Sequence, residues 1–507
     1  MKRTRMKAII IAIIAITIST SLVAQYKYTP DWKSLNKHNA VPEWFADAKL
    51  GVYFHWGVYS VPAMVGEWYP RIMYIHDVDS TQKPWWWGHD YHVDTYGKDF
   101  HYHDFIPMWE APEFDAKEWV DMFEGMGARI IGAIAEHHDG FSLWDSKVNE
   151  WNSAKMGPKI DVVKAIADET KKRDLKFMAT FHHGFHGLFY PKDESSLFLR
   201  PNSARNRSYH NCHVPQDEKY RLLYGNYSYQ EMQELWIDKL DEVIDAHCPD
   251  YIWMDFGQKF IKEDYRQQFL CNYFNRAAEL NKEVVVNTKG DFFPTDLAIV
   301  NVEQSSMDDI QDEVWVTDFI LGAYWCYNKK YRVALDPKFG IRFLADVVSK
   351  NGVMLLSAGP MADGTMPPEQ VESMAAMGRW TKLYGQAIYD TRPFDVFGEG
   401  PSMFKSDKPD GSVSKKQLFK LNPADVRYTR NDNIVYAIQL GWDNENTAKT
   451  LSAFALSKGY KVKKVTVLGS KEKVIWKQSS LGLKVLQPKY KPALADSALV
   501  YKIELKN

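Results

Sequence analysis

Four short apolar runs in this chain each end in a cluster of polar and aromatic residues. The runs lie at residues 52–57, 134–140, 177–184 and 251–257, and their ends are rich in His, Asp and Trp. Strands of a parallel barrel are buried and apolar, and barrel enzymes carry their catalytic groups at the C-terminal ends of those strands. Four such endings in order along the chain therefore predict one pocket built from four strand ends, and they indicate an enzyme.

Strand-like and helix-like segments alternate over residues 30–390. After the strand at 52–57, further strands are expected at 129–135, 175–181, 250–255, 284–287, 298–303 and 353–357. Helices are expected at 161–173, 228–246, 264–281 and near 338–350, and Asp161 is of a residue type that caps helix N-termini. Alternation of this length predicts an α/β fold, a (β/α)8-like TIM barrel, as the catalytic domain.

The pattern changes near residue 391. From residue 395 to 507 the segments are short and alternate apolar and polar residues at a period of two, as in 433–438 and 460–467. This alternation predicts a C-terminal antiparallel β-sandwich domain over 395–507. The module binds sugar or caps the barrel, and the lack of a visible aromatic platform in the sequence favours capping.

Residues 1–24 have the layout of a secretory signal peptide. Four basic residues within 2–7 precede an apolar run over 8–18, and cleavage is expected after Ala24. The apolar run is shorter than the roughly 20 residues that a membrane-spanning helix needs. We therefore expect an exported protein, periplasmic or secreted, with an uncleaved membrane anchor as the alternative.

Bulk composition narrows the set of partners. The formal net charge of −2 gives no reason to expect nucleic acid or an anionic membrane surface. The 18 Trp and 28 Tyr favour carbohydrate, because sugars stack their apolar C–H faces on aromatic rings. The four cysteines are widely spaced without a C-x-x-C pair, so we expect free thiols or at most one disulfide, and no metal site: Cys212, Cys248, Cys271 and Cys326. The oligomeric state stays open.

Asp255 is the strongest candidate for a catalytic group. It follows the fourth apolar run, between Trp253 and Phe256, where partial desolvation would sharpen its charge for covalent attack on a sugar carbon. A glycosidase needs a second carboxyl group, and Glu303 ends the run 299–303. We therefore expect Asp255 as nucleophile and Glu303 as acid/base. The rivals for the second role are Asp308, Asp309, Asp312 and Glu313.

Several residues near the same strand ends suit the binding of sugar hydroxyls. They are His55, Glu67, Trp68, His137, His138 and His182. A neutral imidazole has one donor and one acceptor nitrogen, and a sugar hydroxyl can pair with either. A metal hydrolase is the alternative, because His101 and His103 have the spacing of a zinc-ligand pair. That pair follows no strand, so we expect no metal and no cofactor.

Long motifs lie in order along the predicted barrel. They are residues 44–57 (WFADAKLGVYFHWG), 66–69 (GEWY), 96–100 (YGKDF), 136–141 (EHHDGF), 253–255 (WMD) and 346–352 (DVVSKNG), followed by Gly359-Pro360 and Asp363-Gly364. Over residues 44–367 this series resembles the α-L-fucosidases of glycoside hydrolase family 29. Several long motifs in the right order make the resemblance specific.

The resemblance implies exo-cleavage of terminal α-L-fucose from oligosaccharides or glycoconjugates, with net retention through a covalent fucosyl-enzyme and without metal or cofactor. Asp255 matches the nucleophile of the family, and Trp253 flanks it. The positions that line the fucose pocket are matched by His55, Glu67, Trp68, His137 and His138. Aromatic side chains are expected to contact the C6 methyl group of the sugar.

Three positions depart from the family pattern. Many relatives carry Lys where this chain has Glu136, and Tyr-Tyr-Ser where it has 181–183 (FHH). An arginine that helps to hold the sugar in some relatives is replaced near Thr288-Lys289. Two alternatives therefore stay open: a retaining glycosidase of the same fold for a related sugar such as α-L-galactose, and a catalytically silent sugar-binding barrel. The presence of Asp255 argues against the silent barrel.

Overall fold

Eight parallel strands form a closed barrel. The computed structural model describes residues 27–76, 87–191, 214–290, 292–443 and 447–506. The strand order around the barrel is β1-β2-β3-β4-β5-β6-β8-β9, which confirms the predicted TIM-like architecture. The strands are β1 (Leu50–Phe54), β2 (Ile130–Glu136), β3 (Lys176–Phe181), β4 (Tyr251–Met254), β5 (Val285–Thr288), β6 (Ile299–Glu303), β8 (Trp315–Ile320) and β9 (Gly352–Ala358).

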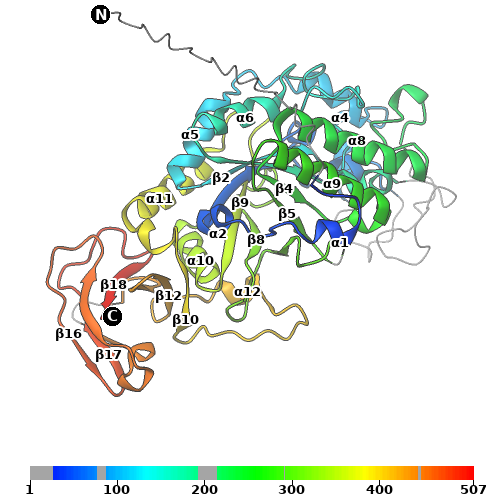
Figure 1. Cartoon of the computed structure of the whole chain (residues 1–507). Helices are drawn as coiled ribbons and strands as arrows, with labels where there is room; N and C mark the ends of the chain where they lie inside the picture. The colour runs from blue at the N-terminus through cyan, green and yellow to red at the C-terminus, as the bar shows by residue number, and fades with distance from the viewer. Residues whose placement is uncertain (1–26, 77–86, 192–213, 291, 444–446, 507) are drawn as a thin grey trace, which may run out of the picture.

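Helices surround the barrel (Figure 1). They are α5 (Ala116–Met126), α6 (Val162–Lys171), α8 (Tyr229–His247), α9 (Glu263–Glu279), α10 (Pro337–Ser349) and α11 (Pro368–Tyr384). The Asp161 carboxylate accepts a hydrogen bond from the backbone N–H of Lys164, which confirms the predicted N-cap of α6. At the start of α8, Ser228 and Glu231 form a capping box. Such caps satisfy N–H groups that a helix leaves unpaired at its first turn.

Residues 315–320 form a barrel strand that the sequence pattern does not predict. All six residues of this strand, β8, are buried, and it pairs in parallel with β6 and β9. Asp318 interrupts the apolar run of β8, and a charged residue is exceptional inside a buried strand. Because of this interruption, the sequence pattern does not predict the strand. The barrel nevertheless needs β8 to close, since β8 lies between β6 and β9.

The C-terminal region forms two antiparallel sheets with a core of their own, as predicted (Figure 1). The larger sheet has the order β10-β12-β13-β18-β15, and the smaller has the order β14-β17-β16. The strands are β10 (Arg392–Glu399), β12 (Val426–Asn431), β13 (Ile434–Gln439), β14 (Ala448–Leu451), β15 (Val462–Val467), β16 (Trp476–Ser479), β17 (Gly482–Leu486) and β18 (Leu499–Leu505). Arg427 of β12 is fully buried, and its Nε lies 2.7 Å from Oδ1 of Asp346 on α10. This ion pair ties the module to the barrel.

The segment that joins the two regions returns to the barrel. Its short strand β11 (Ser412–Ser414) pairs in antiparallel fashion with β7 (Ser305–Met307), which follows β6. The predicted signal peptide, residues 1–24, lies outside the described residues. In the described ranges, the helices are all too short or too polar to cross a membrane. Cys248, Cys271 and Cys326 are free thiols, and Cys212 lies outside the described residues.

Candidate active site

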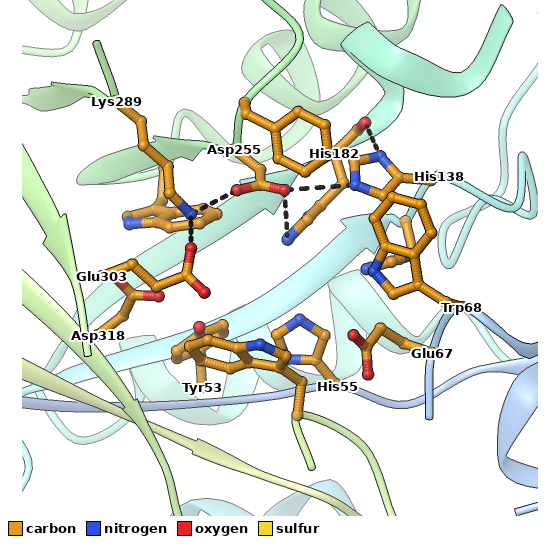
Figure 2. Close-up of a pocket in the computed structure, with 14 residues that line it drawn as sticks. Tyr53, His55, Glu67, Trp68, His138, His182, Asp255, Lys289, Glu303 and Asp318 are labelled. Carbon is orange, nitrogen blue, oxygen red and sulfur yellow. Dashed lines mark hydrogen bonds and ion pairs between the residues drawn. The ribbon is translucent and has the colours of Figure 1, made fainter. Parts of the chain in front are cut away.

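A pocket of about 470 Å³ lies at the C-terminal ends of the barrel strands (Figure 2). It is lined by all nine residues for which the sequence predicts a catalytic or binding role: His55, Glu67, Trp68, His137, His138, His182, Trp253, Asp255 and Glu303. Most of them end or directly follow β1, β2, β3, β4 or β6, while Glu67 and Trp68 precede the short helix α3 (Tyr69–Ile72). The barrel gathers these side chains because all its strands end at one rim.

Asp255 directly follows β4, and two side chains hold its carboxylate. Nζ of Lys289 donates to Oδ1 at 2.7 Å, and Nε2 of His138 lies 3.3 Å from Oδ2. Nδ1 of His138 donates to the backbone carbonyl of His182 at 2.6 Å, which orients the ring. Burial would raise the pKa of Asp255, but the charge of Lys289 and the hydrogen bond with His138 hold that pKa well below its usual value. The carboxylate is therefore ionised.

Glu303 is the last residue of β6, and Lys289 joins it to Asp255. Nζ of Lys289 lies 2.7 Å from Oδ1 of Asp255 and 2.7 Å from Oε2 of Glu303. The two carboxylate oxygens are therefore separated by no more than twice 2.7 Å. The side chain of Glu303 is 42 % exposed and that of Asp255 is 8 % exposed, so the two carboxylates differ in their access to water.

Three buried histidines, His55, His137 and His182, lie side by side in the pocket. Their ring centroids are 4.6 to 5.5 Å apart. Burial lowers the pKa of all three, that of His55 to about 3, so the rings are neutral near pH 7. Nδ1 of His137 and Nδ1 of His182 have no hydrogen-bond partner among the described residues. Neutral rings with unused nitrogens suit the hydroxyl groups of a ligand.

The same three histidines could hold a metal ion. Their ligand atoms lie within 4.8 Å of one another, and neutral imidazole is the form that binds metals. The zinc-type pair singled out in the sequence lies elsewhere: His101 stacks on Tyr74, and His103 stacks on Tyr220. Neither member of that pair lines the pocket.

Glu67 and several aromatic rings complete the pocket wall. Glu67 is buried, and burial raises its pKa to about 7. Its Oε2 finds no hydrogen-bond partner within the described part of the chain. The rings of Trp68 and Phe256 are stacked, with centroids 6.3 Å apart and planes 7° apart. Apolar ring faces therefore lie next to hydrogen-bonding groups, as in sites for small polar ligands.

Five lining residues are not predicted as site residues from the sequence: Tyr53, Phe256, Lys289, Asp318 and Trp325. Lys289 directly follows β5, so the strand-end rule that identifies Asp255 also applies to it. Asp318 lies within β8, which is not predicted. The rival carboxylates Asp308, Asp309, Asp312 and Glu313 do not line the pocket.

Glu136, one of the departures from the family pattern, forms a buried ion pair at the end of β2. Its Oε1 lies 2.6 Å from Nζ of Lys239 on α8, and the two side chains are 0 % and 4 % exposed. Ser142 donates its hydroxyl to Oε2 at 2.6 Å. Burial acts to raise the pKa of Glu136, but Lys239 lowers it below its usual value. The pair anchors the strand end from which His137 and His138 project.

Replacing Lys239 by Met is expected to lower the free energy of unfolding by about 3–5 kcal/mol, because the Glu136 carboxylate would stay buried without its partner. Urea unfolding followed by circular dichroism measures the change. Lys171→Met, at an exposed position on α6, is the matched control and should change stability by less than about 0.5 kcal/mol. Equal effects of the two substitutions would show that the buried pair does not stabilise the fold.

Two family models match the chain. The α-L-fucosidase model covers residues 15–386, and the model of the α-L-fucosidase C-terminal domain covers residues 421–506. Together they span the barrel and most of the C-terminal sheets.

Individual relatives agree with the family models. The tissue α-L-fucosidase of Rattus norvegicus is 27 % identical, over 95 % of this chain and 93 % of its own length. The α-L-fucosidase of Dictyostelium discoideum is 26 % identical, over 77 % of this chain and 80 % of its own. The structure of Thermotoga maritima α-fucosidase in complex with fucose superposes with a TM-score of 0.71 at 26 % identity, over 94 % of this chain and 100 % of that chain. The chain therefore belongs to the α-L-fucosidase family, glycoside hydrolase family 29, and is a glycoside hydrolase of the α-L-fucosidase type.

Proposed function

We propose that the protein is a retaining exo-α-L-fucosidase in which Asp255 is the nucleophile and Glu303 is the acid/base. The observation that carries the proposal is the Lys289 bridge, since one ammonium group touches both carboxylates at 2.7 Å. Retaining glycosidases use carboxyl groups about 5–5.5 Å apart, and inverting enzymes need about 6.5–9.5 Å. The bridge supports the shorter separation, which leaves no room for a water molecule between nucleophile and sugar.

In the first step, a carboxylate oxygen of Asp255 attacks C1 of the bound fucoside. The bond from C1 to the glycosidic oxygen breaks, and this oxygen takes the proton of Glu303 and leaves with the aglycone. In the second step, Glu303 removes a proton from water, the water oxygen bonds to C1, and the ester to Asp255 breaks. Two inversions at C1 return the α-anomer, and each carboxyl group regains its starting state.

We propose terminal α-L-fucose of oligosaccharides or glycoconjugates as the substrate. The unused imidazole nitrogens of His137 and His182 and the free carboxylate oxygen of Glu67 supply partners for ring hydroxyls. The stacked rings of Trp68 and Phe256 offer apolar surface for the C6 methyl group. α-L-Galactose carries a hydroxyl on C6, and burying that hydroxyl against rings without a hydrogen bond costs free energy. The related solved structure with bound fucose supports the same choice.

A colour-releasing aryl α-L-fucoside tests the proposal, with the matching α-L-galactoside as comparison. Wild type should hydrolyse the fucoside faster, and the first product in the NMR spectrum should be α-L-fucose. Preference for the galactoside would reassign the sugar, and a β-anomer as first product would reject retention. Sugar binding without turnover would identify a silent binding barrel.

Replacing Lys289 by Met is expected to move the acid limb of the kcat/KM profile to higher pH. Lys289 helps to hold the pKa of Asp255 well below its usual value, and attack requires the ionised carboxylate. Activity is lost as pH falls through that pKa, so raising the pKa should reduce activity more at acidic pH than at neutral pH. Lys289→Arg, which keeps the charge, is the matched control. An unmoved acid limb in Lys289→Met would contradict the role of this charge.

We also propose that the protein is exported, to the periplasm or beyond, through the predicted signal peptide. The support is the run of basic residues and the apolar segment within residues 1–24. N-terminal sequencing of protein from fractionated cells tests the proposal. A mature chain that begins at Gln25 is expected, and intact protein in the cytoplasmic fraction would reject it.

A further inference from the structure

We propose that Asp318 is a positioning residue of the reaction: a third carboxyl group beside Glu303 that offsets the charge of Lys289, so that Glu303 can act as the proton donor. The inference rests on the proposed function, because it takes Glu303 as the acid/base. Asp318 is not predicted from the sequence, and it lies on the strand that the sequence pattern does not reveal.

The strand register places Asp318 next to Glu303. In the parallel pairing of β6 with β8, Glu303 is the direct neighbour of Asp318. Asn301 precedes Glu303 by two residues on β6, and its side-chain amide donates to Oδ1 of Asp318 at 2.8 Å. The Asp318 residue is 1 % exposed, so packing and this hydrogen bond hold it in one place. Figure 2 shows Asp318 beside Glu303, with Lys289 above them.

Glu303 needs such a neighbour because of Lys289. An ammonium group at 2.7 Å stabilises the ionised form of a carboxyl group, whereas an acid catalyst must start with its proton. Asp255 offsets this charge only in part, because both carboxyl groups share the one ammonium group. A negative charge on Asp318 therefore tips the balance toward a proton on Glu303, because like charges at short range disfavour double ionisation.

The other titratable groups around the pair do not supply this charge. Tyr53 on β1 is neutral, since burial, with the nearby carboxylates, raises its pKa well above the usual value. Glu67 lines the same pocket, but it precedes α3 and is not a strand neighbour of Glu303. Burial raises the pKa of Asp318 to about 7, although Lys289 acts to lower it. Asp318 therefore gains its charge as the pH rises through about 7.

The test compares kcat/KM against pH for wild type and Asp318→Asn, with an alkyl α-L-fucoside whose poor leaving group requires the acid. The alkaline limb of the variant should move down by about one pH unit, so that the loss of rate is greater at alkaline than at acidic pH. Asp318→Glu, which keeps the charge, should keep the wild-type limb. Asp312→Asn, an exposed carboxylate outside the pocket, is the matched control and should not move it.

Asp318→Ser should give the same shift, so the test does not depend on one folded variant. An alkaline limb that stays in place in both neutral variants, or a rate that falls equally at every pH, would overturn the inference. If the alkaline limb of the kcat/KM profile stays near pH 7 in both variants, that limb reports the titration of Glu67, which both variants retain. If instead wild type does not hydrolyse fucosides, or Glu303→Ala does not discriminate between leaving groups, the proposed function itself fails.

Discussion

Replacing Asp255 by Gly is expected to lower kcat for an aryl α-L-fucoside by about 10⁴-fold or more, the loss seen when a covalent nucleophile is removed. The reason is geometric, since Asp255 is buried at the end of β4 and is held by Lys289 and His138. No other carboxylate in the described pocket has both contacts. The rate is measured with substrate above its KM, so that the loss reports the chemical step.

Azide should restore part of the Asp255→Gly activity, because it is small enough to occupy the space of the lost carboxylate. It would attack C1 on the face opposite the leaving group, so the product should be β-L-fucosyl azide. Asp264→Ala, at an exposed position on α9, is the matched control and should leave kcat unchanged. Near wild-type turnover by Asp255→Gly without azide would contradict the assignment.

Replacing Glu303 by Ala is expected to lower the rate of hydrolysis most for substrates with the poorest leaving groups. An alkyl fucoside should lose about 10²–10⁴-fold, the usual contribution of a general acid, and a dinitrophenyl fucoside should lose far less in its first step. Loss of the general base should then make breakdown of the fucosyl-enzyme limiting for activated substrates. A pre-steady-state burst of released phenol measures this accumulation.

Azide distinguishes the two carboxyl groups. In Glu303→Ala it should attack the ester on Asp255 from the opposite face, so the product should be α-L-fucosyl azide, the anomer not formed by Asp255→Gly. Asp309→Ala and Glu313→Ala are the matched controls, since these carboxylates follow Glu303 without lining the pocket. If either control showed the leaving-group dependence and the azide product in place of Glu303→Ala, the acid/base would be misassigned.

The barrel could be predicted because most of its strands are continuous apolar runs that end in polar clusters. β8 could not be predicted, because Asp318 breaks its run after three residues. The buried carboxyl group of Asp318 is stabilised by Asn301 and the nearby Lys289. These tertiary contacts cannot be read from the local hydrophobicity of the sequence. Prediction of strands from apolar runs therefore fails where function places a polar residue inside a strand.

The candidate site could be assembled in outline from strand ends alone, since His55, His137, His182 and Asp255 each follow an apolar run. The bridge could not be predicted. Lys289 follows β5 in sequence, but the pairing of one ammonium group with two carboxylates depends on barrel closure and side-chain reach. The same holds for the buried pair of Glu136 and Lys239, whose members are 103 positions apart in sequence.

Trapping with a 2-fluoro-fucosyl fluoride, followed by proteolysis and mass spectrometry of the labelled peptide, tests the central claim most directly. The fluorine at C2 destabilises both transition states, while the good leaving group still allows the first step, so the fucosyl-enzyme should accumulate. The account predicts one ester-linked label per chain, on Asp255. A label on any other residue, or full inactivation without a covalent label, would contradict it.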